Sequence, residues 1–184
     1  VLRGALEVLA DARFMLMIVV YSGFWVLYFQ NFGSVLWYLR DFVDRAPVST
    51  AVTSWLRGLG LPWTFTFDVE HVTVINAGTI ILLQVLISRL VRDWKPLPTM
   101  VTGMALGALG FLLLASSRDP WVFVLGIAVF SIGEMTAHPK YYSFVGLVAP
   151  ADRKAVYMGY AFLYGVLGSL LGSSLGAFLY QWML

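Results

Sequence analysis

Five apolar runs dominate the chain, and each is about as long as a helix that crosses a bilayer. The runs cover about 14–39, 71–91, 97–115, 120–148 and 155–184. A transmembrane helix needs roughly 20 predominantly apolar residues. Lipid offers no hydrogen-bond partners, so the backbone groups of each run must be paired within it, which favours helices over open strands. The sequence therefore predicts an all-α, polytopic transmembrane helix bundle, with residues 1–184 forming a single unit.

The composition agrees with a membrane protein. Only 12% of the residues are charged, whereas soluble domains carry about 25%, and the mean hydropathy is +0.81. A net charge of +2 is too small to favour nucleic acid as a partner, and the absence of cysteine excludes disulfides and thiolate metal sites. No cleavable signal pattern follows Val1, and the chain ends within an apolar run. We therefore expect a fragment of a longer membrane protein.

The basic residues predict an orientation. With the N-terminus inside, the inner connections carry more basic residues than the outer ones, as the positive-inside rule requires. The inner set is Arg3, Arg13, Arg89, Arg92, Lys95, Arg153 and Lys154, and the outer set is Arg40, Arg45, Arg57 and Arg118. The 40–70 connection then lies outside. A short interfacial helix is expected within it, because apolar residues follow helical spacing at Val48, Val52, Trp55, Leu56 and Leu59.

Glycines recur at short spacing in two of the runs. They are Gly103, Gly107 and Gly110 in the third run and Gly165, Gly168, Gly172 and Gly176 in the fifth. Small residues let helix backbones approach closely in a membrane, where no hydrophobic effect drives helices together. The glycines therefore predict close helix packing and a compact bundle, and nothing catalytic follows from them.

Polar residues inside the runs are the candidates for function. They are Gln30, Asn31, Asn76, Gln84, Glu134, Thr136 and His138. Placing an ionisable side chain near the middle of a membrane costs at least about 2.5 kcal/mol. The presence of Glu134 in the fourth run therefore indicates a functional site, and an interhelical hydrogen bond is the alternative explanation. Gln30 and Asn76 suit either helix packing or the lining of a pathway.

The residues after Glu134 raise a second possibility. His138 follows Glu134 by four residues and shares its helix face, which allows a proton relay. A hydrogen-bonded interfacial histidine is the alternative, because Pro139 is expected to interrupt the helix there. Lys140 is expected to extend its ammonium group towards the inner surface.

The sequence contains no recognisable motif of an enzyme or of a metal site. The chain has no phosphate-binding GxxxxGK[ST] stretch, no HExxH and no paired carboxylates within a run. His71 and His138 do not have the spacing of a metal site. We therefore expect no enzyme, no cofactor and no metal.

Four stretches occur together in an order and spacing that identify a family. They are "FWVLYFQNFGS" (24–34), "VINAGTIILLQVLISRL" (74–90), "IGEMTAHPKYYSFVGLVAP" (132–150) and "YMGYAFLYGVLGSLLGSSLG" (157–176). The chain resembles the C-terminal half of the major facilitator transporters, close to the proton-dependent oligopeptide transporter branch. The resemblance implies that the five runs are helices seven to eleven, a partial C-terminal domain, and that an N-terminal half completes the transporter.

The resemblance also implies roles for individual residues. Glu134 matches the tenth-helix glutamate that receives the positively charged amino group of the substrate, and Asn76 matches an asparagine that contacts the peptide. Trp25 and Gln30 match positions that line the cavity. His138 stands where the family carries a serine before the tenth-helix proline.

We therefore expect part of a secondary active transporter in the bacterial inner membrane, performing proton-coupled symport of peptides or another small solute. Its partners would be the lipid bilayer, the solute, the proton and the N-terminal half, and Glu134 and His138 are the candidates for proton coupling. The alternatives are a divergent facilitator with a non-peptide substrate and a non-transporting membrane scaffold. Convergence of Gln30, Asn76 and Glu134 on one surface would distinguish transport from scaffolding.

Overall fold

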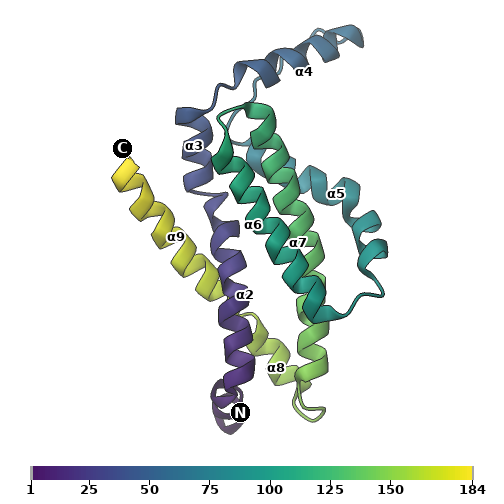
Figure 1. The fold of residues 1–184 in the computed structure, drawn as a ribbon, viewed down its shortest axis with the longest axis vertical. Helices are drawn as coiled ribbons and strands as arrows, with labels where there is room; N and C mark the ends of the chain where they lie inside the picture. The colour runs from purple at the N-terminus through teal and green to yellow at the C-terminus, as the bar shows by residue number, and fades with distance from the viewer. Residues whose placement is uncertain (1, 184) are drawn as a thin grey trace.

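The computed structural model describes the backbone of residues 2–183 and the side chains of residues 6–182, so Val1, Leu184 and the side chain of Arg3 lie outside the described residues. Within this range the chain forms helices joined by turns and loops, with no strand (Figure 1). The helices are α1 (Leu2–Ala10), α2 (Ala12–Gln30), α3 (Ser34–Phe42), α4 (Ala46–Gly58), α5 (His71–Val91), α6 (Pro96–Ser116), α7 (Pro120–Val148), α8 (Lys154–Ala161) and α9 (Leu163–Met183).

The predicted fold class is confirmed. Five helical segments are long and apolar enough to cross a membrane: Ala12–Phe42, His71–Val91, Pro96–Ser116, Pro120–Val148 and Lys154–Trp182. Helix α7 has 29 residues, or about 43 Å at 1.5 Å per residue. That length exceeds the roughly 30 Å of the hydrocarbon core, so the ends of α7 extend into the interfaces.

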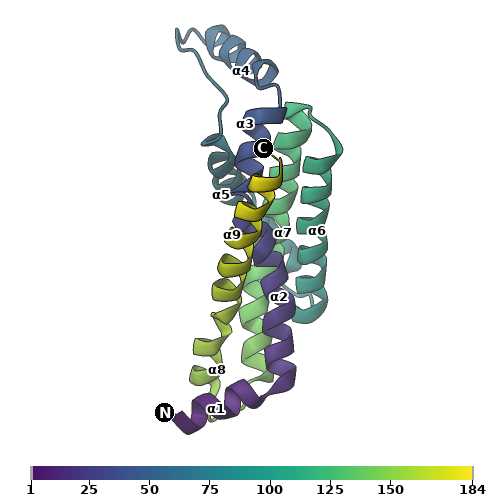
Figure 2. The same cartoon turned by 90° about the vertical axis from the view of Figure 1, so that its left-hand side faces the viewer.

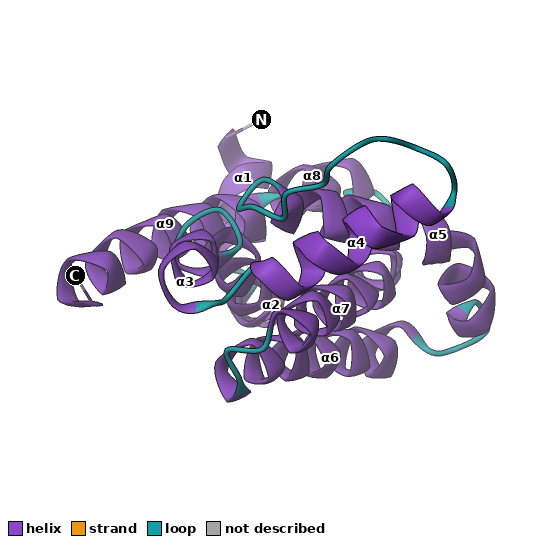
Figure 3. Ribbon diagram, turned by 90° about the horizontal axis from the view of Figure 1, so that it is seen from above, coloured by secondary structure: helices purple, strands orange, loops and turns teal. Residues whose placement is uncertain are grey.

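Helices α6 and α7 form the closest pair in the bundle. A Cβ atom at Gly133 would lie 2.6 Å from the Gly103 carbonyl oxygen and 2.6 Å from the Gly107 nitrogen. A Cβ atom at Gly110 would lie 2.7 Å from the Gly126 carbonyl oxygen. The two backbones therefore touch directly. Seen from above, α6 lies at one edge beside α7 and α2, while α5 and α9 lie on opposite sides (Figure 3).

A second glycine contact joins α9 to α2. Gly168 packs on the Trp25 side chain and Gly172 on Phe29, where an added Cβ atom would lie 2.4 and 2.8 Å from the respective Cβ atoms. Gly176 lies beside the Gln30 side chain. The predicted packing role is therefore confirmed at these three positions. It is wrong for Gly165, where an added Cβ atom would meet open space.

Two of the predicted runs are each built from two helices. The first run breaks into α2 and α3 at a turn over residues 31–33, and the fifth breaks into α8 and α9 at Phe162. At the second break the Gly165 N–H bonds to the Phe162 carbonyl, while the Ala161 carbonyl accepts the Tyr141 hydroxyl at 2.8 Å. A side chain from α7 thus satisfies a carbonyl next to the break.

The predicted interruption at Pro139 is wrong, because α7 continues through this residue to Val148 (Figure 1). Proline removes one backbone hydrogen bond, but membrane helices tolerate this loss where neighbouring helices hold the segment. Here Ala137 packs against Gly103 of α6, and Tyr141 is hydrogen-bonded to Ala161. Contacts on both sides of Pro139 therefore keep the helix continuous.

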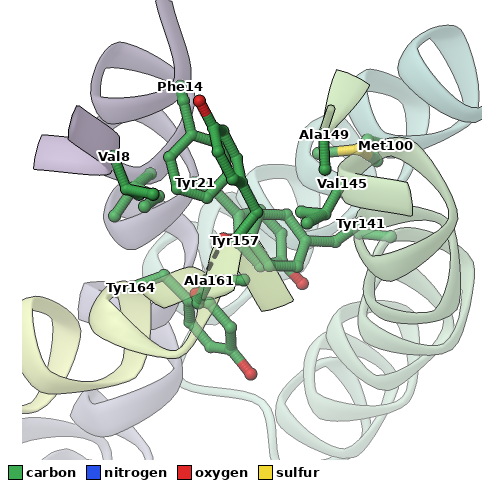
Figure 4. Packing of buried hydrophobic residues seen from close by; sticks show 12 residues of the cluster. Val8, Phe14, Tyr21, Met100, Tyr141, Val145, Ala149, Tyr157, Ala161 and Tyr164 are labelled. Atoms are coloured by element: carbon green, nitrogen blue, oxygen red, sulfur yellow. Dashed lines mark hydrogen bonds between the residues drawn. The ribbon is translucent and has the colours of Figure 1, made fainter. Parts of the chain in front are cut away.

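A hydrophobic cluster joins α1, α2, α7 and α8 at one end of the bundle (Figure 4). Tyr21 and Tyr141 are fully buried and stack with their ring centroids 4.1 Å apart. Asp11 caps α2 by accepting the backbone N–H groups of Arg13 and Phe14 and also accepts the Tyr157 hydroxyl at 2.9 Å. The Phe14 N–H in particular holds the pKa of the Asp11 carboxyl below its usual value.

The opposite end of the bundle carries the predicted helix of the 40–70 connection, which is α4 (Figure 2). The chain after α4 returns along it: the Phe65 N–H bonds to the Thr53 hydroxyl at 2.9 Å, and the Phe67 N–H bonds to the Ser49 hydroxyl at 2.9 Å. An ion pair between Arg45 and Asp68 closes this segment. Helix α4 and its return segment therefore form an ordered cap over one end.

We predict that Gly133→Ala destabilises the bundle. The added methyl group has no room between the α6 and α7 backbones, and such overpacking typically costs about 1–3 kcal/mol. Thermal unfolding of the purified protein in detergent, followed by circular dichroism, measures the effect. Gly78→Ala in α5 is the matched control, because its new methyl group meets open space. Equal melting temperatures for the two variants would contradict this account of the α6–α7 contact.

Candidate functional site

Helix α7 carries a polar stripe of Glu134, His138 and Tyr142, spaced four residues apart on one helix face. Gly133 and Ala137, the residues that precede Glu134 and His138, pack against α6. The stripe itself is directed to other helices: Glu134 contacts α5, and His138 contacts α2. Glu134 is the central residue of Pro120–Val148. The contact with α6 thus fixes the rotation of α7 that turns this stripe towards α5 and α2.

Glu134 and Asn76 form the polar centre of the candidate site. The Asn76 amide donates hydrogen bonds from Nδ2 to Glu134 Oε2 at 3.2 Å and to the Ser131 hydroxyl at 2.9 Å. Both Glu134 and Asn76 are half-buried. Among the residues whose side chains are described, no Lys or Arg forms an ion pair with Glu134. A carboxyl group is thus held at mid-helix by neutral groups alone.

His138 lies among aromatic rings. Its Nδ1 atom is 3.2 Å from the Tyr21 hydroxyl, a hydrogen bond whose direction depends on the histidine tautomer. The imidazole centroid is 5.3 Å from the Trp25 ring and 5.3 Å from the Tyr142 ring. Each imidazole tautomer carries one donor and one acceptor nitrogen, so His138 is chemically able to pass a proton.

Trp25 connects this region to α9. Its ring centroid lies 5.0 Å from that of Tyr164 and 4.7 Å from that of Tyr28. The buried indole N–H has no hydrogen-bond partner among the described residues. Trp25 is therefore part of the aromatic surround of His138 rather than a direct partner of Asn76.

Gln30 lies elsewhere, although the sequence grouped it with the other candidates. Its Nε2 atom donates to the Gly172 carbonyl at 2.7 Å, and its Oε1 atom accepts the Ser34 hydroxyl at 2.8 Å. Gln30 is 4% exposed. These bonds join α2 to α9 and to α3, so the structure uses Gln30 in helix packing. The structure brings Asn76 together with Glu134 and places Trp25 beside His138, but it separates Gln30 from both pairs.

Sequence reasoning missed four residues around Glu134 and His138: Tyr28, Ser131, Tyr142 and Tyr164. Tyr28 packs on Trp25 with the ring centroids 4.7 Å apart, and the Tyr142 and Tyr164 hydroxyls are 3.1 Å apart. The spacing of Ser131 and Tyr142 from Glu134, three residues before and eight after, was a signal for a shared face. Tyr28 and Tyr164 gave no such signal, because they belong to other helices.

The surroundings of the polar stripe include a nearby lysine but no group of metal-ligating side chains among the described residues. No cluster of three or more His, Cys, Asp or Glu residues that could hold a metal ion occurs in the part of the chain that the structure describes. Lys140, close to the stripe in sequence, donates from Nζ to the Arg92 and Trp94 carbonyls at 2.9 Å each. Its ammonium group therefore ties α7 to the α5–α6 connection.

The five membrane-length apolar helices define the chain as a polytopic helical membrane protein. Among curated proteins, it is similar to the uncharacterized MFS-type transporter YttB of Bacillus subtilis (strain 168), with 23% identity over 144 residues. These residues make up 77% of this chain and 36% of that protein, so the chain spans about a third of its relative. No family model and no solved structure matches the chain. The similarity supports a relationship with the major facilitator superfamily, without confirming the oligopeptide branch.

We predict that Gln30→Leu lowers stability. The substitution removes the hydrogen bonds that join α2 to α3 and α9, and such bonds in membrane proteins contribute about 0.6 kcal/mol on average and up to about 1.7 kcal/mol. Gln84→Leu is the matched control, because among the described residues the Gln84 side chain bonds to Ser88 of its own helix and to no other helix. Thermal unfolding in detergent compares them. A melting temperature that falls no further for Gln30→Leu than for Gln84→Leu would contradict the packing role.

Proposed function

We propose that this chain is part of a secondary active transporter, with Glu134 and Asn76 at the centre of its solute site. The carrying observation is a carboxyl group at the middle of a membrane-length helix whose hydrogen-bond partner is a neutral amide on another such helix. Helix packing alone is served by amides and hydroxyls, as Gln30 shows. A carboxyl group adds an exchangeable proton and a negative charge, which are properties that transport uses.

The exposed faces of the outer helices are consistent with a solute site that lies between this bundle and a second set of helices. Helix α5 has many exposed apolar side chains, and so does α9. In major facilitator transporters the solute binds near the midplane between two halves that rock around it. We propose that a second helical half covers the Asn76–Glu134 region in the whole transporter. We also propose the bacterial plasma membrane as its location, with α4 outside and the α5–α6 and α7–α8 connections inside.

Proton-coupled symport is the mechanism that we propose for this site. Symport requires that the solute and the proton are bound in the same state, and therefore by two groups. When Glu134 pairs with a cationic group on the solute, it would release its proton towards His138, which is hydrogen-bonded to Tyr21 and would hold the proton in that state. The two groups are four residues apart on one helix, so a movement of α7 affects both.

The resemblance to oligopeptide transporters makes peptides with a free amino group one solute class for such a site. A divergent facilitator that carries another small cationic solute is the second class, and the pair of Glu134 and Asn76 suits both. A non-transporting scaffold is less well supported, because a scaffold has no use for a mid-membrane carboxyl group without a fixed counter-charge.

We predict that Glu134→Gln abolishes proton-driven solute accumulation while folding and membrane insertion are preserved. The amide keeps the shape and hydrogen-bonding capacity of the side chain but loses its charge and its exchangeable proton. Proteoliposomes that contain the full-length transporter, with an acidic exterior and a neutral interior, measure accumulation. Exchange of solute down its own gradient is expected to survive in part.

Glu70→Gln is the control for this experiment, because Glu70 is exposed and precedes α5 outside the membrane-length segments. It should accumulate solute as the unaltered protein does. Accumulation by Glu134→Gln at the rate of Glu70→Gln would show that Glu134 serves helix packing and would overturn the proposed function. Accumulation driven only by the opposite proton gradient would replace symport by exchange.

A further inference from the structure

Helices α8 and α9 are held by different parts of the bundle, although they follow each other directly in the chain. Gly168 and Gly172 of α9 pack on α2, and the Gln30 side chain of α2 donates to the Gly172 carbonyl at 2.7 Å. Helix α8 instead contacts α1, α7 and the start of α2, at the end of the bundle where α1 lies (Figure 2). The two helices therefore have separate anchors on either side of their junction at Phe162.

The junction is a break that no proline causes, because no proline follows Pro150 in the sequence. Phe162 is 60% exposed, and Gly159 and Gly165 lie three residues before and after it. An added Cβ atom at either glycine would meet open space, so close packing does not explain these two glycines. Glycine makes a helix less stable than alanine does and allows the backbone angles to change. The two glycines therefore favour a bend centred on Phe162.

Polar contacts hold α8 against the beginning of the chain. Arg153, the residue before α8, forms an ion pair with Glu7 of α1. The Tyr157 hydroxyl donates to Asp11 Oδ2 at 2.9 Å, and the ring centroids of Tyr157 and Phe14 lie 4.7 Å apart. We call Glu7, Asp11, Arg153 and Tyr157 the clasp. The clasp joins α8 to residues that come about 146 positions earlier in the chain.

The clasp is able to open without disturbing the helices around it. The side chains of Arg153 and Glu7 are 42% and 37% exposed, and exposed ion pairs contribute little to stability because water and salt screen them. Asp11 caps α2 through Oδ1, whereas it accepts the Tyr157 hydroxyl through Oδ2. The cap of α2 therefore remains in place when Tyr157 leaves.

We infer that α8 is a strap that swings about Phe162, and that the clasp holds this strap closed against α1 and α7. Hinges of this kind lie at the ends of helices, where a few residues absorb the change in backbone angles. Helix α9 stays on α2, because its glycine contacts are independent of the clasp. The Tyr157 ring is 6% exposed in the closed position, so opening exposes apolar surface and the open state is the minor one.

The closed strap covers a route to His138. The Ala161 carbonyl at the end of α8 accepts the Tyr141 hydroxyl at 2.8 Å. The fully buried Tyr141 ring stacks on Tyr21, and the Tyr21 hydroxyl is hydrogen-bonded to His138 Nδ1. Opening of the strap would bring the solution at this end of the bundle close to these tyrosines. The value of such access for transport rests on the proposed function, whereas the movement of the strap does not.

Distances between pairs of spin labels, measured by double electron–electron resonance, test the strap in the full-length protein in lipid nanodiscs. Residues 1–184 contain no cysteine, and any cysteine elsewhere in the protein is replaced. Thr102→Cys in α6 and Ala155→Cys in α8, both at exposed positions, carry the labels of the strap pair. Thr102→Cys with Ser173→Cys in α9 is the control pair. We expect a minor second distance for the strap pair and a single distance for the control pair.

The double variant Glu7→Gln with Tyr157→Phe weakens the clasp while it keeps the size of both side chains. We expect the minor population of the strap pair to rise at least about fivefold, because two contacts that involve charged groups are lost. Asp41→Asn with Tyr160→Phe is the matched control. Asp41 forms an exposed ion pair with Arg40 in α3, and Tyr160 is a tyrosine of α8 outside the clasp. A melting temperature for each variant shows that it folds.

Gly159→Ala with Gly165→Ala tests the hinge in the opposite direction. Alanine resists the change in backbone angles that opening requires, and both new methyl groups meet open space. We therefore expect the minor population of the strap pair to fall at least about threefold, with no loss of melting temperature. Gly78→Ala in α5 is the control, because its methyl group also meets open space.

Each contrary outcome overturns a defined part of this inference. A single distance for the strap pair in every variant would show that α8 does not move. Equal populations for the clasp variant and its control would show that the clasp does not hold α8. Equal changes in the strap and control pairs, or no effect of the two alanines, would remove the hinge at Phe162. The proposed function fails by a different result, namely unaltered solute accumulation by Glu134→Gln.

Discussion

The direct contact between the α6 and α7 backbones is the constraint on which the rest of the structure depends. Because Gly133 touches Gly103 and Gly107 without an intervening side chain, α7 has a fixed rotation about its axis. The polar stripe is then turned to α5 and α2 rather than to α6. A larger residue at Gly133 would separate the helices and shift Glu134 relative to Asn76. The glycines thus position the site although none of them belongs to it.

The polar side chains within the bundle have different roles, which depend on their hydrogen-bond partners. Gln30 bonds to a backbone carbonyl of α9 and to a hydroxyl that follows it in α3, which satisfies both ends of its amide. Glu134 is bonded by a single amide and has no fixed counter-charge among the described side chains. For Gln30, the hydrogen bonds between helices offset the cost of burying a polar group. For Glu134, the carboxyl charge has no such compensation, and this charge is the property that our proposed transporter uses.

Much of the fold could be predicted from the sequence, because the length of an apolar run and the spacing of its glycines are properties of a single helix. The contacts between helices do not follow in the same way. Asn76 and Glu134 are 58 residues apart in the sequence. The sequence indicates that each is a polar side chain placed in the membrane at a cost in free energy, but it does not show that the two are in contact. Gln30 is equally costly, yet its partner Gly172 is 142 residues away. Pro139 was expected to break α7, and only the contacts of Ala137 and Tyr141 explain why it does not.

The central claim is that Glu134 is an exchangeable group in contact with solute and proton rather than a fixed packing element. Infrared difference spectroscopy of the full-length transporter tests it most directly, by comparing spectra before and after a change of pH. Our account predicts a carboxyl band that responds to this change and that is missing from the Glu134→Gln difference spectrum. A band assigned to Glu134 that stays constant over the whole pH range in which the protein remains folded would contradict the account.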